Sequence, residues 1–145
     1  MATNKTILLK GDPLRKEREA GGAITPGDLI KVGSDGKVVV HATAGGNAQR
    51  AFAIENDLAG EEIGDAYASG ERVQYLVCRR GDEVMARLKA SENVVVGDFL
   101  ESAGDGTLQK HVVESSGAIY VEQIVGMVLE ASNVGTVARV AIEIV

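Results

Sequence analysis

Two Asp-Gly pairs, each placed between short apolar runs, constrain the fold of this chain more than any other feature. They are Asp35-Gly36, between residues 29–32 and 38–40, and Asp105-Gly106, between residues 99–100 and 108–113. Glycine adopts a positive φ at no steric cost and aspartate tolerates one, so such a pair favours a tight reversal between two paired strands. The sequence therefore predicts two β-hairpins.

The two predicted hairpins are similar in sequence at a constant offset of 70 residues. Residues 24–30 (ITPGDLI) align with residues 94–100 (VVVGDFL), and the same offset superposes both Asp-Gly pairs and the two histidines, His41 and His111. Agreement over this many positions at one spacing is unlikely by chance. It indicates that the two hairpins are copies of one unit.

The similarity continues beyond the hairpins. It resumes at an offset of 75 residues between residues 51–55 and 126–130. We interpret the pattern as an internal duplication of a β-unit, with copies at residues 24–56 and 94–131. Residues 57–89 are additional material between the copies, with one short helical turn expected around residues 61–68.

A Gly-Asp pair opens each copy, at Gly27-Asp28 and at Gly97-Asp98. Glycine can take a backbone conformation that is closed to other residues, and aspartate can cap the turn that follows with its side chain. We therefore interpret both pairs as turns that lead the chain into a strand. A ligand site built from Asp28 and Asp98 is the alternative.

Alternation of apolar and polar residues predicts further strands, because side chains of a strand point to opposite faces in turn. The pattern covers residues 138–144, 73–77 and 84–88. The break at residues 79–82 (RRGD) predicts that the last two form a hairpin, and we expect residues 120–129 to pair with the C-terminal strand. The fold class is therefore mainly β: a small β-barrel or β-tulip-like domain built from duplicated hairpin units, with an extended N-terminal arm.

Residues 1–20 differ from the rest of the chain. Asp12-Pro13 is typical of a helix start and Gly21-Gly22 of a helix end, but the segment between them has only one large apolar residue, Leu14. Such a segment buries too little to be stable alone as a helix. We expect residues 1–20 to form an arm whose structure depends on a partner, and residues 21–145 to form a single β-domain.

The arm holds a local concentration of basic residues, which are Lys10, Arg15, Lys16 and Arg18. The chain as a whole is acidic, with 15 Lys and Arg against 21 Asp and Glu and a net charge of −6. An acidic partner would be repelled least at the arm, so these four residues are the candidate partner-binding residues. A solvated segment of mixed charge, with no binding role, is the alternative.

Charge and composition exclude several functions. A net charge of −6 argues against nucleic-acid binding and against an electrostatic membrane anchor. The apolar run at residues 7–9 is too short for a signal peptide or a membrane span, which predicts synthesis in the cytoplasm. With a single cysteine, Cys78, no disulfide can form within the chain, and its apolar neighbours predict a buried thiol.

Residues with catalytic or metal-binding potential are few. His41 and His111 occupy equivalent positions of the duplication, each at the end of a hairpin, and no cysteine or carboxylate lies beside either at metal-ligand spacing. No phosphate-binding loop, nucleophile elbow or zinc-protease motif occurs. The glycine-rich residues 102–106 precede a strand rather than a helix. We therefore expect no enzyme activity, no metal and no cofactor.

Taken together, residues 23–30 (AITPGDLI), the Asp-Gly turn, residues 51–55 (AFAIE) and residues 58–61 (LAGE) resemble the capsid decoration, or cement, proteins of tailed bacteriophages. The resemblance rests on a "Gly-Gly-x-Ile-x-x-Gly-Asp" opening from Gly21 and an "aliphatic-Glu-x-x-x-x-Gly-Glu" segment that ends at Glu61.

The resemblance implies a homotrimeric β-domain on the outer capsid surface of the virion. Such a protein is made in the host cytoplasm, binds the major capsid protein and its own copies, and reinforces the shell against internal pressure, without enzyme activity or cofactor. It also implies that the N-terminal arm clamps capsid subunits or a neighbouring protomer.

Two other functions stay open. One is a structural module of a tail or fibre base, although the chain has neither the longer repeats nor the stem usual in fibres. The other is a β-clip module of the SAF type in a sugar-acid enzyme, because similar turn-strand units occur there.

Overall fold

The computed structural model describes residues 5–112 and 121–145, and almost all of its regular structure is β. Its strands are β1 (Leu8–Lys10), β2 (Leu14–Glu19), β3 (Ile30–Val32), β4 (Val38–Val40), β5 (Ala51–Ala53), β6 (Arg72–Val77), β7 (Glu83–Leu88), β8 (Asn93–Val94), β9 (Phe99–Ser102), β10 (Leu108–Lys110), β11 (Gly126–Val128), β12 (Ser132–Asn133) and β13 (Ala138–Ile144). Two 3-10 turns, η1 (Asp57–Ala59) and η2 (Val121–Gln123), complete the described elements.

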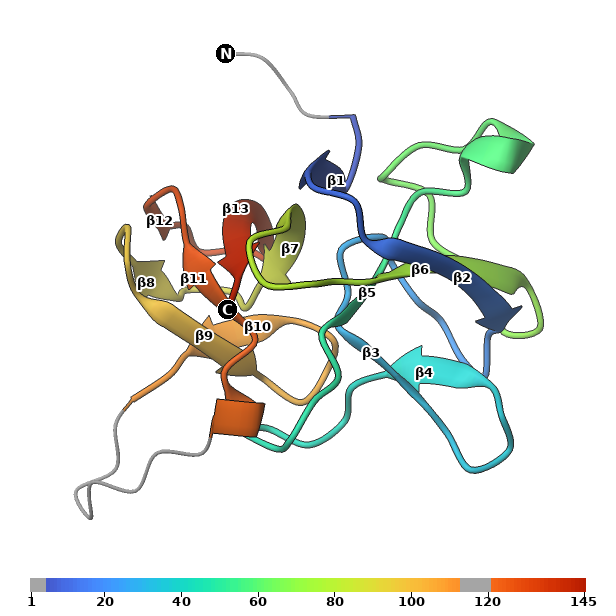
Figure 1. The fold of residues 1–145 in the computed structure, drawn as a ribbon, viewed down its shortest axis with the longest axis horizontal. Helices are drawn as coiled ribbons and strands as arrows, with labels where there is room; N and C mark the ends of the chain where they lie inside the picture. The colour runs from blue at the N-terminus through green and yellow to red at the C-terminus, as the bar shows by residue number, and fades with distance from the viewer. Residues whose placement is uncertain (1–4, 113–120) are drawn as a thin grey trace.

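Five strands close into a barrel in the order β7-β10-β9-β11-β13. The longest pairing joins β13 to β7 in antiparallel register, from Ala138 opposite Leu88 to Glu143 opposite Glu83. The barrel closes on the other edge of β7 through a parallel pairing of Leu108 with Leu88. This arrangement, at the left of Figure 1, confirms the prediction of a small β-barrel.

The barrel core follows from the alternation of side chains along its strands. In β13 the side chains of Val140, Ile142 and Ile144 are buried, while their neighbours are only partly buried. In β9 the buried residue is Leu100, and Phe99 beside it is exposed. The alternation predicted for residues 138–144 is therefore confirmed, and it places one face of each strand in the barrel interior.

A second layer lies beside the barrel, at the right of Figure 1, and consists of the sheet β2-β6-β5 and the hairpin β3–β4. It has its own core, in which Tyr67, Ile24 and Val38 are almost completely buried. The Tyr67 hydroxyl donates a hydrogen bond of 2.7 Å to the Ile54 carbonyl oxygen, so this buried polar group is satisfied.

Both Asp-Gly hairpins are confirmed. In β3–β4, Val32 lies opposite Val38 across Asp35-Gly36, and in β9–β10, Ser102 lies opposite Leu108 across Asp105-Gly106. The predicted pairing of the segment before the C-terminal strand is also confirmed, because β11 pairs with β13. The duplication itself stays a prediction, and residues 113–120 of the second copy lie outside the described residues.

The predicted hairpin of residues 73–77 and 84–88 is wrong. β6 pairs with β2 and β5, whereas β7 pairs with barrel strands, so the two segments belong to different sheets. The turn between them carries the chain from one layer to the other. The Gly81 backbone N–H there donates to the Ile144 carbonyl oxygen of β13 rather than to a residue of β6.

The N-terminal segment also differs from the expectation. Its described part pairs with the rest of the chain: β1 with β7, and β2 with β6 over six residues. Ile7 and Ala20, at either end, are fully buried. Pairing with a neighbouring strand satisfies the backbone hydrogen bonds of this segment, although it has few apolar side chains to bury. The expectation of a partner-dependent arm considered only how much a helix would bury. The expected helical turn near residues 61–68 also lies earlier, at η1.

Three turns of the chain share one geometry. The Asp28, Asp82 and Asp98 carboxylates each accept a hydrogen bond from the backbone N–H three residues earlier, at 2.8, 2.8 and 2.9 Å. The glycine before each aspartate has φ of +97°, +92° and +94° in the same order. The interpretation of the two Gly-Asp pairs as turns is thus confirmed. The sequence predicts a turn at residues 79–82 as well, but not that Gly81-Asp82 has the geometry of the two Gly-Asp pairs.

Candidate partner-binding surface

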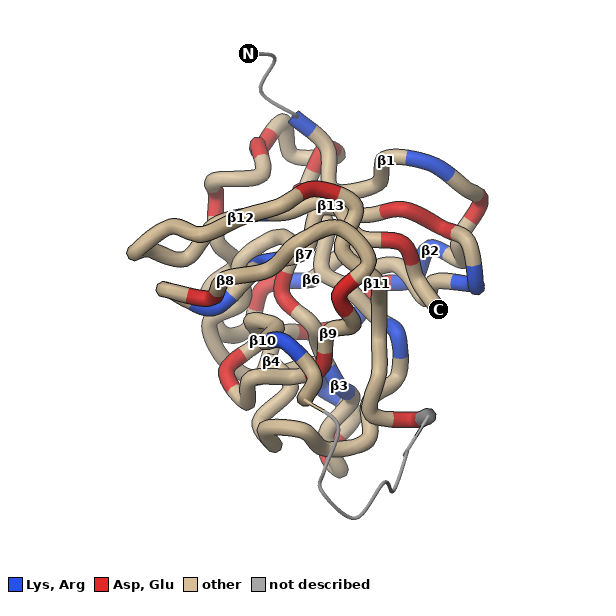
Figure 2. The backbone as a smooth tube through the Cα atoms, turned by 90° about the vertical axis from the view of Figure 1, so that its left-hand side faces the viewer, with Lys and Arg blue, Asp and Glu red and all other residues tan. Residues whose placement is uncertain are grey.

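Three of the four predicted basic residues, Arg15, Lys16 and Arg18, lie on strand β2, which is an edge of its sheet, and Lys10 lies on β1. β2 pairs with β6 on one side only, and all six of its side chains are exposed. Figure 2 shows basic and acidic residues mixed along β1 and β2. Charged side chains are common on edge strands because they discourage pairing with the edge of another sheet. This property supports the alternative of a solvated segment of mixed charge with no binding role.

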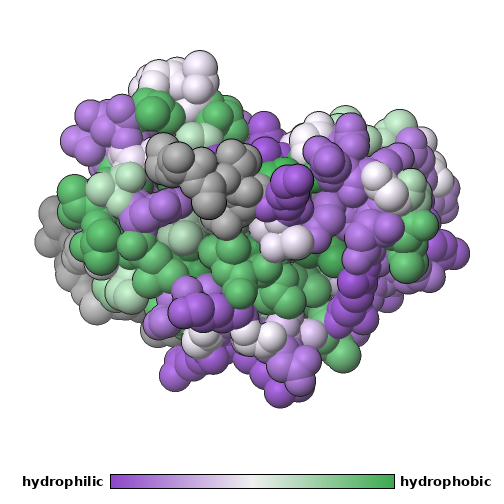
Figure 3. Space-filling view, turned by 90° about the horizontal axis from the view of Figure 1, so that it is seen from above, coloured by the Kyte–Doolittle hydropathy of each residue, from purple (hydrophilic) through white to green (hydrophobic). Residues whose placement is uncertain are grey.

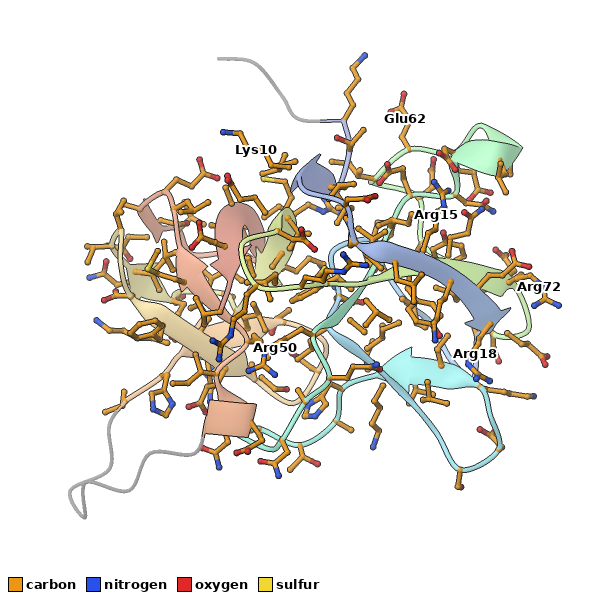
Figure 4. All side chains as sticks on the ribbon, in the orientation of Figure 1. Lys10, Arg15, Arg18, Arg50, Glu62 and Arg72 are labelled. Carbon is orange, nitrogen blue, oxygen red and sulfur yellow. The ribbon has the colours of Figure 1, made fainter. Side chains whose placement is uncertain are left out.

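Of the four candidate residues, Arg15 and Arg18 are engaged within the chain. The Arg15 guanidinium donates to the Gln74 side-chain oxygen and forms an ion pair of 2.5 Å with Asp57. Arg18 donates a hydrogen bond of 3.1 Å to the Gly36 carbonyl oxygen, in the turn of the β3–β4 hairpin. Figure 4 shows Arg15 near the start of β2 and Arg18 near its end.

The other two candidates, Lys10 and Lys16, are exposed, and neither ammonium forms an ion pair within residues 5–112 and 121–145. Lys10 lies on β1, opposite Glu83 of the barrel. Lys16 lies on β2, opposite Tyr75. The structure therefore leaves two separate ammonium groups available to a partner, on two successive strands, rather than one cluster of four cations.

A shallow groove of about 470 Å³ runs between β2 and the turn of the β3–β4 hairpin. It is lined by basic and acidic side chains together with Gly36 and the nearly buried Tyr75; the charged residues are Lys16, Glu17, Arg18, Glu19 and Arg72. Because its walls carry both signs of charge and little apolar surface, the groove is suited to polar contacts with a protein surface and poorly suited to enclosing a small apolar ligand.

Acidic side chains balance much of the basic charge around β2. Glu17 lies 3.9 Å from Arg72, and Glu19 lies 3.6 Å from Lys37. All four side chains are exposed, so each pair contributes at most about 1 kcal/mol to stability. The surface is therefore one of mixed charge, and a complementary partner would also need to present both signs.

His41 forms a buried pair with Ser102. Its Nδ1 lies 2.7 Å from the Ser102 hydroxyl, and its Nε2 lies 2.9 Å from the Asn47 carbonyl oxygen. A serine beside a histidine can serve as a nucleophile and its base. Here, however, Ser102 is fully buried and His41 is 4% exposed, so both groups are closed off from solvent in this structure. The pair joins β9 to the chain after β4.

His111 has a different environment, although it too directly follows a hairpin strand. Its Nδ1 lies 2.7 Å from a Glu101 carboxylate oxygen, and the other Glu101 oxygen accepts a hydrogen bond from the Gln109 amide. Among the described residues, no three His, Cys, Asp or Glu side chains are grouped so that they could hold a metal ion.

Asp28 and Asp98, the residues of the alternative ligand site, each pair with a different basic residue of the chain. Asp28 is buried and forms an ion pair of 2.7 Å with Arg87, while Asp98 lies 3.2 Å from the Lys110 ammonium. Burial raises the pKa of the Asp28 carboxyl, which its hydrogen bonds offset in part. For Asp98, the hydrogen bond from Val95 lowers the pKa.

Cys78 is a buried free thiol, as predicted, and burial raises its pKa to about 12. A thiol with such a pKa is protonated at neutral pH and is a poor nucleophile or metal ligand. Over the residues described, no helix has the length and apolar character needed to cross a membrane.

The fold, a closed five-stranded barrel with a second β-layer at its side, matches that of a bacteriophage structural protein. The solved structure is the head fibre gp8.5 N base of bacteriophage phi29, with a TM-score of 0.56 and 15% sequence identity. The match covers 91% of this chain and 93% of that one. At this identity the likeness establishes the shared fold. No protein-family model matches the chain, and no curated protein does.

One surface feature is not predicted by the sequence, an apolar pocket lined by Phe99. Alternation predicts that Phe99 and Leu100 face opposite sides of β9, but it does not tell which of the two is inside. A signal was nevertheless present in composition. The chain has only two phenylalanines, and one of them, Phe99, directly follows a Gly-Asp turn at the barrel surface.

Proposed function

We propose that this chain is a non-enzymatic structural protein of a phage virion that binds the outer surface of the capsid and stabilises it against internal pressure. The observation that carries the proposal is the fold shared with a phage head fibre base over nine-tenths of both chains. The sequence resemblance to capsid decoration proteins supports the same location independently. The expected partners are the major capsid protein and further copies of the chain in a homotrimer, with neither nucleic acid nor membrane.

The exposed edge at β2 is the proposed contact with the shell or with a neighbouring protomer. Lys16 on β2 and Lys10 on the preceding strand β1 supply positive charges that form no ion pair among the described residues, while Arg15 and Arg18 hold β2 against the η1 region and the β3–β4 turn. Several weak contacts become strong when they are joined in one oligomer, because each then acts at a high effective concentration. Modest contacts at β2 would therefore suffice for retention on a capsid.

A second candidate function is the base of a head fibre. It is favoured by the fold that this chain shares with the head fibre base of phage phi29. The two functions share a position on the capsid and differ in copy number and in what is attached. A decoration protein occupies many equivalent positions, whereas a fibre base carries further chain or a partner outward.

The β2 contact is tested by charge reversal rather than by deletion, since removing residues 1–20 would also remove Ile7, Ala20 and two paired strands. The variant Lys10→Glu with Lys16→Glu is compared with Lys31→Glu with Lys89→Glu, which reverses two exposed lysines elsewhere. Purified protein is added to washed capsids, and the bound fraction is measured after sedimentation.

We expect the β2 variant to lose about tenfold or more in affinity and the control to bind as the wild type does. Equal binding of both variants would overturn β2 as the contact while leaving the capsid role intact. If the wild type itself fails to sediment with capsids, the proposed function is wrong.

A further inference from the structure

An apolar hollow opens on the barrel surface next to Phe99, and we call it the Phe99 pocket. It has a volume of about 340 Å³, and its walls include Phe99, Ile124, Val145, Arg50 and Arg80. Phe99 is 45% exposed although it lies in a barrel strand, because the alternation of β9 directs Leu100 inward instead. Aromatic residues, phenylalanine among them, are enriched at protein interfaces relative to the rest of the surface.

The rim of this pocket is fixed and carries basic side chains. Arg50 donates hydrogen bonds to the carbonyl oxygens of Val145 and Ile124, which holds one wall in place. Arg80 is exposed and forms no ion pair within the part of the chain that the structure describes. Among the described residues that line the pocket, Glu143 is the one with an acidic side chain. Arg80 is thus available to a carboxylate of a partner.

A complementary projection occurs elsewhere on the same chain, at residues 57–62, and we call it the Leu58 knob. Leu58 lies on η1 and is 80% exposed, and η1 has no buried residue. Glu61 and Glu62 follow it, and no Lys or Arg occurs between Arg50 and Arg72.

The knob is also anchored to the barrel. Arg139 of β13 donates a hydrogen bond of 2.6 Å to the Ile63 carbonyl oxygen, directly after the knob. In addition, Arg15 pairs with Asp57 at its start. The Leu58 knob is therefore an exposed segment whose position is fixed by these two contacts. It is apolar at Leu58 and acidic at the glutamates that follow.

We propose that the Leu58 knob of one copy inserts into the Phe99 pocket of a second copy, with Glu61 or Glu62 beside Arg80. The proposal rests on the self-association contained in the proposed function, and it names the surfaces that produce it. The apolar knob fits an apolar hollow, and acidic side chains meet a basic rim. Insertion would remove from water an almost fully exposed leucine and the open face of Phe99.

The knob and the pocket lie apart on one molecule, as the positions of Glu62 and Arg50 in Figure 4 show. The contact is therefore heterologous: each copy uses its knob toward one neighbour and its pocket toward another. Such contacts form a ring when the rotation between copies closes, which is the geometry that a homotrimer needs.

The test measures the molar mass of the full chain by sedimentation velocity over a range of concentrations. The variants are Leu58→Ser and Arg80→Glu, with Val32→Ser as a matched control, because Val32 is an exposed apolar residue at 43% exposure outside both surfaces. We expect the wild type and the control to associate, and each of the two interface variants to weaken association about tenfold or more.

Mixing the two interface variants gives the sharpest outcome. The Leu58→Ser chain keeps a pocket and the Arg80→Glu chain keeps a knob, so their mixture should form a dimer of one chain of each kind and nothing larger. Charge exchange is a second check, because Glu62→Arg combined with Arg80→Glu in one chain should restore association that each change alone weakens.

A wild type that stays monomeric throughout, or variants that associate as strongly as the wild type, would overturn this inference. Neither result bears on capsid binding, which the sedimentation assay with capsids measures separately. Conversely, association through these surfaces without any capsid binding would leave the inference standing and overturn the proposed function.

Discussion

Asp28 and Arg87 form an ion pair of 2.7 Å that joins the two β-layers of the molecule. Asp28 lies in the turn before β3, and Arg87 lies on the barrel strand β7. The Asp28 carboxylate also accepts the Thr25 backbone N–H and lies directly under Gly106, where a Cβ atom would come within 2.9 Å of its carboxyl carbon. The glycine of one hairpin turn thus makes room for the aspartate that opens the other hairpin.

Removing Arg87 should destabilise the protein strongly, because it leaves the Asp28 carboxylate buried without its charge partner. We expect Arg87→Ala to lower the free energy of unfolding by about 3 kcal/mol. The control is Arg72→Ala, which removes an exposed ion pair with Glu17 and should change stability by less than about 1 kcal/mol. Urea unfolding measures both variants, and equal losses would contradict the role given to Asp28 and Arg87.

Gly27 should not tolerate a side chain. It has φ of +97°, and a Cβ atom there would lie 3.0 Å from the Met85 carbonyl oxygen. We expect Gly27→Ala to cost about 1–3 kcal/mol of unfolding free energy. Gly64→Ala is the matched control, because nothing lies within 4 Å of its Cβ position and its turn needs no positive φ. A Gly27→Ala protein as stable as the Gly64→Ala protein would show that the turn adapts.

Asp105 should contribute to the loss of stability in acid. The hydrogen bond from the Thr107 hydroxyl lowers the pKa of Asp105 below 3.8, so its stabilising contribution is complete above that pH and is lost as the pH falls through the folded-state pKa. We therefore expect the stability of Asp105→Asn to fall less than that of the wild type below about pH 4. The measurement is the unfolding free energy of both proteins as a function of pH.

Asp28 should have the opposite effect on how the unfolding free energy changes with pH. Because burial raises its pKa above 3.8, the wild type should gain stability relative to Asp28→Asn as the pH falls through the window just above that value. Parallel pH profiles for all three proteins would contradict both assignments.

Cys78 should be unreactive in the folded protein. It is buried, and its pKa of about 12 leaves almost no thiolate at pH 8. We expect iodoacetamide to modify it at a rate limited by unfolding, and rapidly once urea is added. Mass spectrometry of the modified chain follows both rates. Rapid alkylation without denaturant would show that the core around Cys78, directly after β6, opens locally.

The hairpins could be predicted from the sequence because their determinants are local. Asp35-Gly36 and Asp105-Gly106 each fix a chain reversal within a few residues. The alternation of apolar and polar residues along β13 likewise predicts which of its side chains are buried. The partners of β6 could not be predicted in this way. A stretch such as residues 79–82 suits a hairpin and a crossover between layers equally, and the choice depends on strands distant in sequence.

The contacts of the candidate site could not be predicted for the same reason, because they join residues that are distant in sequence. Composition identifies Arg15 as a basic residue of a polar segment, but its carboxylate partner, Asp57, is 42 residues further along the chain. Likewise, the exposure of Phe99 and of Leu58 depends on how the sheets close rather than on their neighbours in sequence. Figure 3 shows apolar side chains reaching the surface in a band between hydrophilic ones, a pattern that no local signal predicts.

The central claim is that many copies of this chain lie on the outside of a phage capsid. It is tested most directly by counting the chain in washed, intact virions by quantitative mass spectrometry, with the major capsid protein as the internal standard. We predict a fixed ratio that corresponds to many copies per shell. Its absence from washed virions would contradict the account, and a few copies per virion would favour a tail or vertex component instead.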